Sequence, residues 1–297
     1  MLRVKNINMN KTLLFSFLGF VFFQVSSCDL IDEPEEIPSY IQIDTIRVQS
    51  QMNSEGSSSH NIKDAWLFVN NQLIGAFELP MRAPVLEEGE QLVEVFAGID
   101  DNGVIAIPEV YPFYDRYRAT KTLKRGEVLV VEPTVLYNDD AVFGFIEDFE
   151  LGNLFGADID GNDLTRIEIT NTGKFEGQRS GVILLNEENP IFEHGTANFY
   201  ELYDENNPTS PVYVELNYKN NIPFEVGIIG FENNALVEKV YVTGMNPSDK
   251  WNKIYINMSL DINSMKADNY QIVIRAIKPQ NVETGEIFLD NIKLLHF

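Results

Sequence analysis

Cysteine is almost absent from this sequence of 297 residues, because Cys28 is the only one. A lone thiol cannot form a disulfide within one molecule, which excludes a fold held together by internal disulfides. Basic residues are also scarce: 22 Lys and Arg stand against 45 Asp and Glu, for a net charge of −23. Binding to nucleic acid depends on basic residues that neutralise phosphate groups, so we predict no nucleic-acid partner.

Sequence motifs of the common hydrolases and nucleotide-binding enzymes are missing too. The chain has no Gly-x-Ser-x-Gly, no His-Glu-x-x-His and no phosphate-binding glycine loop. Its three histidines, His60, His194 and His296, stand in unrelated contexts. Two carboxylates about 5–10 Å apart suffice to hydrolyse a glycosidic bond, and 45 acidic residues leave that alternative open. We predict a non-catalytic protein, with a cryptic glycoside hydrolase as the less favoured interpretation.

The first 27 residues have the pattern of an export signal. Three basic residues and no acidic one precede the apolar run 13–23, which is shorter than the ~20 residues of a membrane-spanning helix. The cleavage region Val25-Ser26-Ser27-Cys28 resembles the lipobox of bacterial lipoproteins. The resemblance implies that residues 1–27 are removed and that Cys28 is lipidated as the first residue of a membrane-anchored protein. The alternative is an ordinary buried thiol after a secretory signal.

Residues 28–39 are acidic and contain two prolines, which favours an extended, solvated tether. An acidic patch directly after the lipidated cysteine resembles the surface-export signal of Bacteroidota lipoproteins, which implies an outer-membrane address and exposure on the cell surface. A spacer that holds the protein off a periplasmic leaflet is the alternative. Cleavage removes three basic residues and leaves a net charge of −26, which suits neutral or cationic partners or calcium, and also solubility alone.

The mature length of roughly 270 residues predicts two domains. In residues 40–138, apolar and polar residues alternate along 40–48, and turns such as the Asn-Asn pair at 70–71 separate short strands. We therefore predict an all-β, immunoglobulin-like β-sandwich there, with the small polar segment 53–61 as an exposed loop. A polar stretch at 137–140 marks the domain boundary.

The second domain, residues 143–297, is again rich in strands. About nine strand-like segments follow one another, and a double-sheet jelly-roll β-sandwich is the natural closure for so many. Both domains thus belong to the all-β class.

Part of the first domain resembles the PEGA-type, immunoglobulin-like surface domains. The residues that carry the resemblance are 68–75, a strand with a small-residue hairpin, and 84–95, a turn with a glycine-led strand. That family implies a spacer or adhesion module. The lipobox together with residues 37–44 also resembles the opening of a group of uncharacterised Bacteroidota lipoproteins.

The second domain resembles the jelly-roll carbohydrate-binding modules and their galactose-binding-like relatives, through residues 147–150, 251–256 and 287–292. The resemblance implies glycan binding. In such modules a structural Ca²⁺ commonly lies between a carboxylate near the first strand and an Asp on the last. Glu150 and Asp290 match those positions, with Asp148 as a spare, although all three are also explained as solvent-facing strand residues.

A second candidate for Ca²⁺ is the segment 158–163, Asp-Ile-Asp-Gly-Asn-Asp, in which oxygen-bearing residues stand at alternate positions. It departs from the EF-hand pattern, because Ile169 occupies the place of the bidentate Glu. A polar turn is the favoured interpretation.

Glycan recognition needs aromatic faces together with polar groups that bind hydroxyls. Two segments combine these features. The first contains the candidate ligand residues His194, Asn198, Tyr200 and Tyr203. The second is the aromatic stretch 111–117 with candidates Tyr114 and Tyr117, which is either an exposed binding platform or an apolar plug between the domains.

The sequence thus predicts a two-domain β-sandwich lipoprotein of the outer membrane. Its predicted partners are the membrane, through Cys28, and a glycan held by the jelly-roll domain. An envelope protein in an adhesion or secretion assembly is the alternative partner, and structural Ca²⁺ is the one predicted cofactor.

Overall fold

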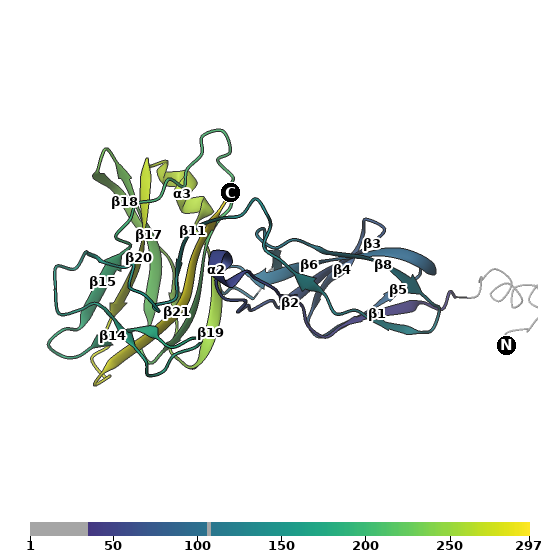
Figure 1. The fold of residues 1–297 in the computed structure, drawn as a ribbon, viewed down its shortest axis with the longest axis horizontal. Coiled ribbons are helices and arrows are strands. Elements are labelled where there is room, and N and C mark those ends of the chain that lie inside the picture. Colours follow the sequence, from purple (N-terminus) through teal and green to yellow (C-terminus); the bar gives the residue numbers. More distant parts are fainter. Residues whose placement is uncertain (1–34, 106–107) are drawn as a thin grey trace, which may run out of the picture.

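The computed structural model describes residues 35–105 and 108–297. The predicted signal, Cys28 and the beginning of the predicted tether lie outside these residues. The described chain forms two β-sandwich units placed end to end, and it enters at the end of the N-terminal unit farthest from the C-terminal unit (Figure 1). The predicted all-β class is confirmed.

Helices contribute little to the described part of the chain. It contains the short helices α2 (Met52–Glu55) and α3 (Ser259–Met265), and no helix there is long and apolar enough to cross a membrane.

The N-terminal unit is built from three short sheets in which most strands pair antiparallel, with parallel pairing at β1–β9 and β2–β10. The sheets have the strand orders β5-β1-β9, β10-β2 and β4-β3-β6-β7, with β8 also paired to β6. The strands are β1 (Ser39–Ile43), β2 (Arg47–Val48), β3 (Asp64–Val69), β4 (Gln72–Glu78), β5 (Met81–Val85), β6 (Gly89–Asp100), β7 (Pro108–Val110), β8 (Tyr117–Leu123), β9 (Val128–Val130) and β10 (Thr134–Val135).

Sequence alternation accounts for the strands that line this core. In β1, Ile41 and Ile43 are buried while Tyr40 and Gln42 are half-buried, as the period of two requires. The hairpin predicted at Asn70 and Asn71 is confirmed between β3 and β4. Both residues have positive φ, 51° and 62°, as the two central positions of a type I′ turn require.

The C-terminal unit consists of two sheets that face each other. One is six-stranded, with the order β13-β14-β21-β16-β19 and β11 paired to β21; the other is five-stranded, with the order β12-β15-β20-β17-β18. The strands are β11 (Val142–Glu147), β12 (Ala157–Asp158), β13 (Ile167–Thr170), β14 (Ser180–Leu185), β15 (Ile191–Gly195), β16 (Val212–Asn220), β17 (Phe224–Glu232), β18 (Ala235–Met245), β19 (Ser248–Asn257), β20 (Asn269–Ile277) and β21 (Gly285–His296).

The core of the C-terminal unit lies between its sheets. Alternate residues of β16 and β21 from one side, and of β17 and β20 from the other, form a single apolar cluster, to which Phe149, Phe155 and Phe192 add their rings. Each sheet of such a β-sandwich has one outer face. The N-terminal unit covers the outer face of one sheet and leaves that of the other free.

The sequence predicts an exposed loop at 53–61, and the structure shows that this prediction is wrong for part of the segment. Part of it forms α2, and the following Gly56 and Ser57 are buried. The Ser57 hydroxyl donates to Glu176, at 2.5 Å, and its carbonyl accepts a hydrogen bond from Nζ of Lys293, at 2.7 Å. A small polar segment is buried here because partners on the C-terminal unit satisfy its backbone and hydroxyl groups.

The outer face of the six-stranded sheet packs against the N-terminal unit. Tyr213, Tyr255 and Leu295 of that sheet belong to the same apolar cluster as the core of the N-terminal unit. The ring of Tyr111 lies 5.4 Å from that of Tyr213 and 4.8 Å from that of Tyr255. The units therefore share a continuous apolar core across their junction.

Charged groups are enclosed in the same junction. The carboxylate of Glu215 lies 2.5 Å from Nζ of Lys253, and neither residue is appreciably exposed. Lys293 is also buried, and its Nζ donates to the Tyr137 hydroxyl at 2.9 Å. Burial alone raises the pKa of Glu215, but the ammonium groups of Lys253 and Lys293 hold it below its usual value, so the carboxylate stays ionised.

Candidate functional site

The free outer face of the C-terminal unit is that of the five-stranded sheet, because the N-terminal unit occupies the opposite one. Directly paired residues of an antiparallel sheet point to the same side. The register pairs Glu193 of β15 with Arg275 of β20, and Arg275 with Glu225 of β17. These three half-buried charged residues therefore form a row across the outer face.

A second row lies beside the first. It consists of Gly195, Val273, Gly227 and Tyr241, from β15, β20, β17 and β18 in that order. Val273 is 0% exposed although it points outward, and its outward neighbour Ile229 is 3% exposed. An apolar floor therefore lies under the middle of this face, and longer side chains cover it.

Glu193 is the centre of the side-chain network that covers the floor. Its carboxylate accepts hydrogen bonds from Nζ of Lys239 and from the hydroxyl of Tyr241, both on β18. Strands β17 and β20 separate β18 from β15, a distance of about 14 Å at a strand spacing of about 4.8 Å. The contacts therefore require the side chains to lie flat across the sheet.

Arg275 completes the network from the other side. Its guanidinium donates to Glu225 at 2.5 and 2.8 Å, and its central carbon lies 3.7 Å from the centre of the Tyr241 ring. That geometry is a cation–π contact, in which the guanidinium covers one of the two faces of the ring. Partial burial raises the pKa of Tyr241, and the bond to Glu193 raises it further, so the phenol stays a donor at physiological pH.

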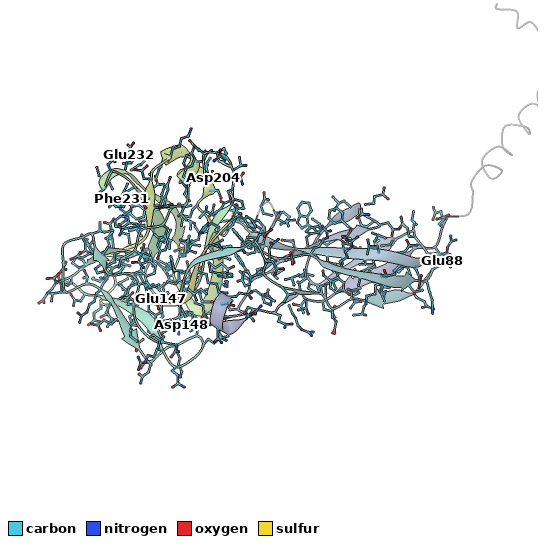
Figure 2. The ribbon with its side chains drawn as sticks, turned by 45° about the horizontal axis from the view of Figure 1, so that its top comes forward. Glu88, Glu147, Asp148, Asp204, Phe231 and Glu232 are labelled. Carbon is cyan, nitrogen blue, oxygen red and sulfur yellow. The ribbon has the colours of Figure 1, made fainter. Side chains whose placement is uncertain are left out.

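The two ends of this face differ. At one end, Glu225, Gly244, Asn246 and Arg275 line a pocket of about 290 Å³. At the other end Phe231, labelled in Figure 2, packs edge-on against the exposed ring of Phe199 with centres 5.0 Å apart. The face thus has a pocket lined by an acidic and a basic side chain, a tyrosine over an apolar floor, and a pair of aromatic rings at its other end.

The predicted ligand residues of the 194–203 segment do not gather into one site. His194 is buried on the inner side of β15, opposite Asp158 of β12. Asn198 is exposed, whereas the half-buried rings of Tyr200 and Tyr203 pack against the core of the C-terminal unit. Tyr200 also pairs with Tyr270 through the backbone, which explains why its ring turns inward.

The prediction of Tyr114 as a ligand residue is corrected by its burial. Tyr114 is 5% exposed, and its hydroxyl lies 3.4 Å from that of Tyr255 on the other unit. The structure places the 111–114 part of the aromatic stretch between the units, as the plug alternative requires. Tyr117 lies apart from it on β8, half-buried against the N-terminal core.

The three residues predicted to bind Ca²⁺ line one pocket. Asp148, Glu150 and Asp290 surround a cavity of about 230 Å³, together with Glu176. Figure 2 shows Asp148 beside helix α2, whose Met52 also borders this cavity. Their carboxylates are occupied by backbone groups: Glu150 accepts from Gln178 and Arg179, and Asp290 accepts from residues 175, 176 and 291.

Burial raises the pKa of Asp290 to about 6, against the opposing effect of those backbone hydrogen bonds. The carboxylate is thus poorly compensated at neutral pH by the groups around it. Calcium binding here stays a prediction.

Glu193, Glu225, Tyr241 and Arg275 are not predicted from the sequence as site residues. The signal that was available is the alternation of polar and apolar residues in β20, where Gln271, Val273 and Arg275 share one side. Alternation identifies the outer side of a strand but not its neighbours, since strand order is not encoded locally.

Comparison with known proteins finds distant structural similarity and no match in sequence. No model of a known protein family matches the chain, and no curated protein matches it in sequence. The CBM22-1 xylan-binding domain of Xyn10C from Paenibacillus barcinonensis is 12% identical, with a TM-score of 0.36 over 52% of this chain and 95% of that one. The family 11 carbohydrate-binding module of Lic26A-Cel5E from Clostridium thermocellum is 18% identical, with a TM-score of 0.34 over 52% of this chain and 94% of that one.

A third similar structure is the enzymatically active domain of tailspike protein 4 from bacteriophage CBA120. It is 9% identical, with a TM-score of 0.36 over 54% of this chain, and the match spans only 20% of the tailspike chain. The structures similar to this chain include several carbohydrate-binding modules.

Proposed function

We propose that this protein is a non-catalytic, lipid-anchored glycan-binding protein of the cell envelope, and that it binds glycan on the outer face of its five-stranded sheet. The observation that carries the proposal is the position of Tyr241 above an apolar floor, between Glu193 and Arg275. Pyranose rings bind to aromatic faces while their hydroxyls bind to carboxylates and cationic donors. This face combines both kinds of group.

The balance of charge on the face favours a neutral glycan. Glu193 and Glu225 supply acceptors, while Arg275 and Lys239 supply donors, and each charge is paired with one of the opposite sign. A strongly anionic or cationic ligand would leave either the acidic or the basic side chains without a partner, which is unfavourable in a partly buried site. Sugar hydroxyls both donate and accept, so they can replace one partner of each pair without adding charge.

The proposed anchor suits this role. With Cys28 lipidated, the chain would leave the membrane through the acidic tether and enter the N-terminal unit at the end opposite the C-terminal unit (Figure 1). The N-terminal unit would then act as a spacer that holds the binding face away from the bilayer. A diacylglyceryl cysteine supplies the roughly two acyl chains that stable anchoring takes.

Affinity electrophoresis and titration calorimetry with soluble neutral polysaccharides test the proposal. Tyr241→Ala removes the ring and should lower affinity about tenfold, since a stacked aromatic contact contributes about 0.5–1.5 kcal/mol beyond its buried area. Tyr241→Phe keeps the ring and should retain most of the binding.

A matched control exists on the N-terminal unit, where the guanidinium of Arg82 lies 4.6 Å from the ring centre of Tyr40. Tyr40→Ala removes the same kind of arginine–tyrosine pair and should leave glycan binding unchanged. No binding across the panel, or equal binding by the wild type and Tyr241→Ala, would refute the proposal. Co-purification of one envelope protein without glycan binding would support the adhesion alternative, and release of reducing sugar would support a hydrolase.

A further inference from the structure

Two acidic residues and a histidine meet at the edge of the five-stranded sheet. Asp158 of β12 is directly paired with His194 of β15, and Asp160 follows two residues later in the turn after β12. One oxygen of each Asp and one nitrogen of His194 all lie within 4.8 Å of one another. The pairing of β12 with β15 thus brings together residues that are more than 30 positions apart in the sequence.

The hydrogen bond at Nδ1 of His194 determines whether Nε2 carries a proton in the neutral ring. Nδ1 lies 3.2 Å from the carbonyl oxygen of Phe155, which can only accept, so Nδ1 must carry the proton in that bond. In the neutral ring, Nε2 then presents a lone pair. His194 is 6% exposed, and its Nε2 atom has no hydrogen-bond partner among the described residues.

What Nε2 faces is another acceptor. The nearest charged atom is Oδ1 of Asp158, at 4.0 Å. A buried lone pair that points toward a carboxylate is unfavourable unless a cation lies between the two. The separation is too long for a direct hydrogen bond. Two tetrahedral ligands with bonds of about 2.0–2.2 Å lie about 3.4 Å apart, so a shift of roughly half an ångström brings both atoms onto one metal ion.

We propose that Asp158, Asp160 and His194 bind a divalent transition metal of the Zn²⁺ class. An imidazole with carboxylates suits zinc and its neighbours, whereas Ca²⁺ prefers oxygen ligands alone. Asp158 is open to solvent on one side, which leaves room for water as a further ligand.

The groups around these side chains orient them for such a site. Phe155 fixes the His194 tautomer through its carbonyl, the Gly161 amide donates to Asp158 at 2.7 Å, and the Glu193 amide donates to Asp160 at 2.6 Å. Backbone partners of this kind hold metal ligands in place and leave further lone pairs free. The metal would tie the 158–163 turn to β15, on the side of the strand opposite to the glycan face. The inference is therefore independent of the glycan-binding proposal.

Titration of chelator-treated protein with Zn²⁺, followed by calorimetry and by equilibrium dialysis, tests the site. We expect one equivalent to bind, and Co²⁺ in its place to give the visible absorption of a nitrogen- and oxygen-coordinated ion. Asp158→Asn and His194→Gln should each weaken Zn²⁺ binding by at least tenfold. Added Zn²⁺ should raise the melting temperature of the wild type and not that of Asp158→Asn.

Asp163→Asn is the matched control, because Asp163 is exposed in the same turn but lies outside the cluster. It should bind Zn²⁺ as the wild type does. If His194→Gln fails to fold, Asp158→Asn decides the question, since Asp158 lies at the surface. Absence of a stoichiometric site, or equal Zn²⁺ affinity in the wild type and Asp158→Asn, would overturn the proposal.

Discussion

The phenol of Tyr111 in the N-terminal unit donates a hydrogen bond of 2.7 Å to the carboxylate of Glu215 in the C-terminal unit. Glu215 is 0% exposed and also accepts from Tyr137, so residues of one unit complete the solvation of a charge that belongs to the other. A buried carboxylate without such partners would be strongly destabilising. The junction therefore contributes to the stability of both units.

Tyr111→Phe removes one of these donors and keeps the ring. We expect it to lower the free energy of unfolding by about 1–3 kcal/mol, because the buried carboxylate of Glu215 loses one of its hydrogen bonds. Chemical denaturation measures the effect. Tyr117→Phe, at a half-buried tyrosine outside the junction, is the control and should be nearly neutral. Equal stability of Tyr111→Phe and wild type would contradict a stabilising role for this bond.

The buried Lys293 should make the stability of the protein depend on pH. Burial lowers its pKa to about 8, against the opposing effect of Glu215. The folded state then loses this proton before the unfolded state, whose lysine has a pKa near 10.5, so the contribution of Lys293 to stability rises with pH between those values.

Relative to Lys293→Met, the wild type should therefore gain roughly 2 kcal/mol of unfolding free energy between pH 7 and 9.5. Lys250→Met, at an exposed lysine, should show no such change relative to the wild type. A wild-type advantage that shrinks over this range would show that the Lys293 pKa is not depressed.

Stability and Ca²⁺ binding at the predicted calcium site should both depend on pH through Asp290. Because its pKa is raised to about 6, the apo protein should lose stability as pH rises from about 4 to 6, relative to Asp290→Asn. Ca²⁺ needs the ionised form, so added Ca²⁺ should raise the melting temperature at pH 7.5 more than at pH 5. Asp204→Asn, at an exposed residue in another part of the unit, serves as control. A melting temperature indifferent to Ca²⁺ and chelator at pH 7.5 would remove the calcium site.

The anchor is tested at Cys28. Cys28→Ala should abolish incorporation of a labelled fatty acid and shift the protein from the membrane fraction to the soluble fraction, since no other cysteine is available for lipidation. Ser27→Ala, a small-for-small change beside it, should preserve labelling. Labelling that persists in Cys28→Ala would contradict the lipoprotein prediction.

The fold was more predictable from the sequence than the site. Asn70 and Asn71 revealed a hairpin because positive φ at two successive residues is a local requirement. Glu215 did not reveal the junction, because a strand such as Tyr213–Asn217, with polar residues at every second position, resembles one with a solvated face. In the structure that face is covered by the other unit, and all of these residues are buried.

The same limit applies to the candidate sites. Asp158 and His194 were each noticed in the sequence, but in separate hypotheses, because only the pairing of β12 with β15 brings them together. Glu193 and Tyr241 are not predicted as site residues because neither stands in a sequence motif on its own strand. What makes them a candidate site is a contact across the width of a sheet, which depends on strand order.

The enclosed junction also has a mechanical consequence. If the chain is held at one end by its anchor and at the other by a bound polymer, any pull on the polymer crosses the junction, where hydrogen bonds from Tyr111 to Glu215 and from Lys293 to Ser57 link the two units beside the chain itself. A flexible hinge there would let the C-terminal unit swing into line with the load. Hydrogen bonds to buried charges and interlocked rings resist such rotation, so the angle between the bound polymer and the N-terminal unit would be set by the protein rather than by the direction of the pull.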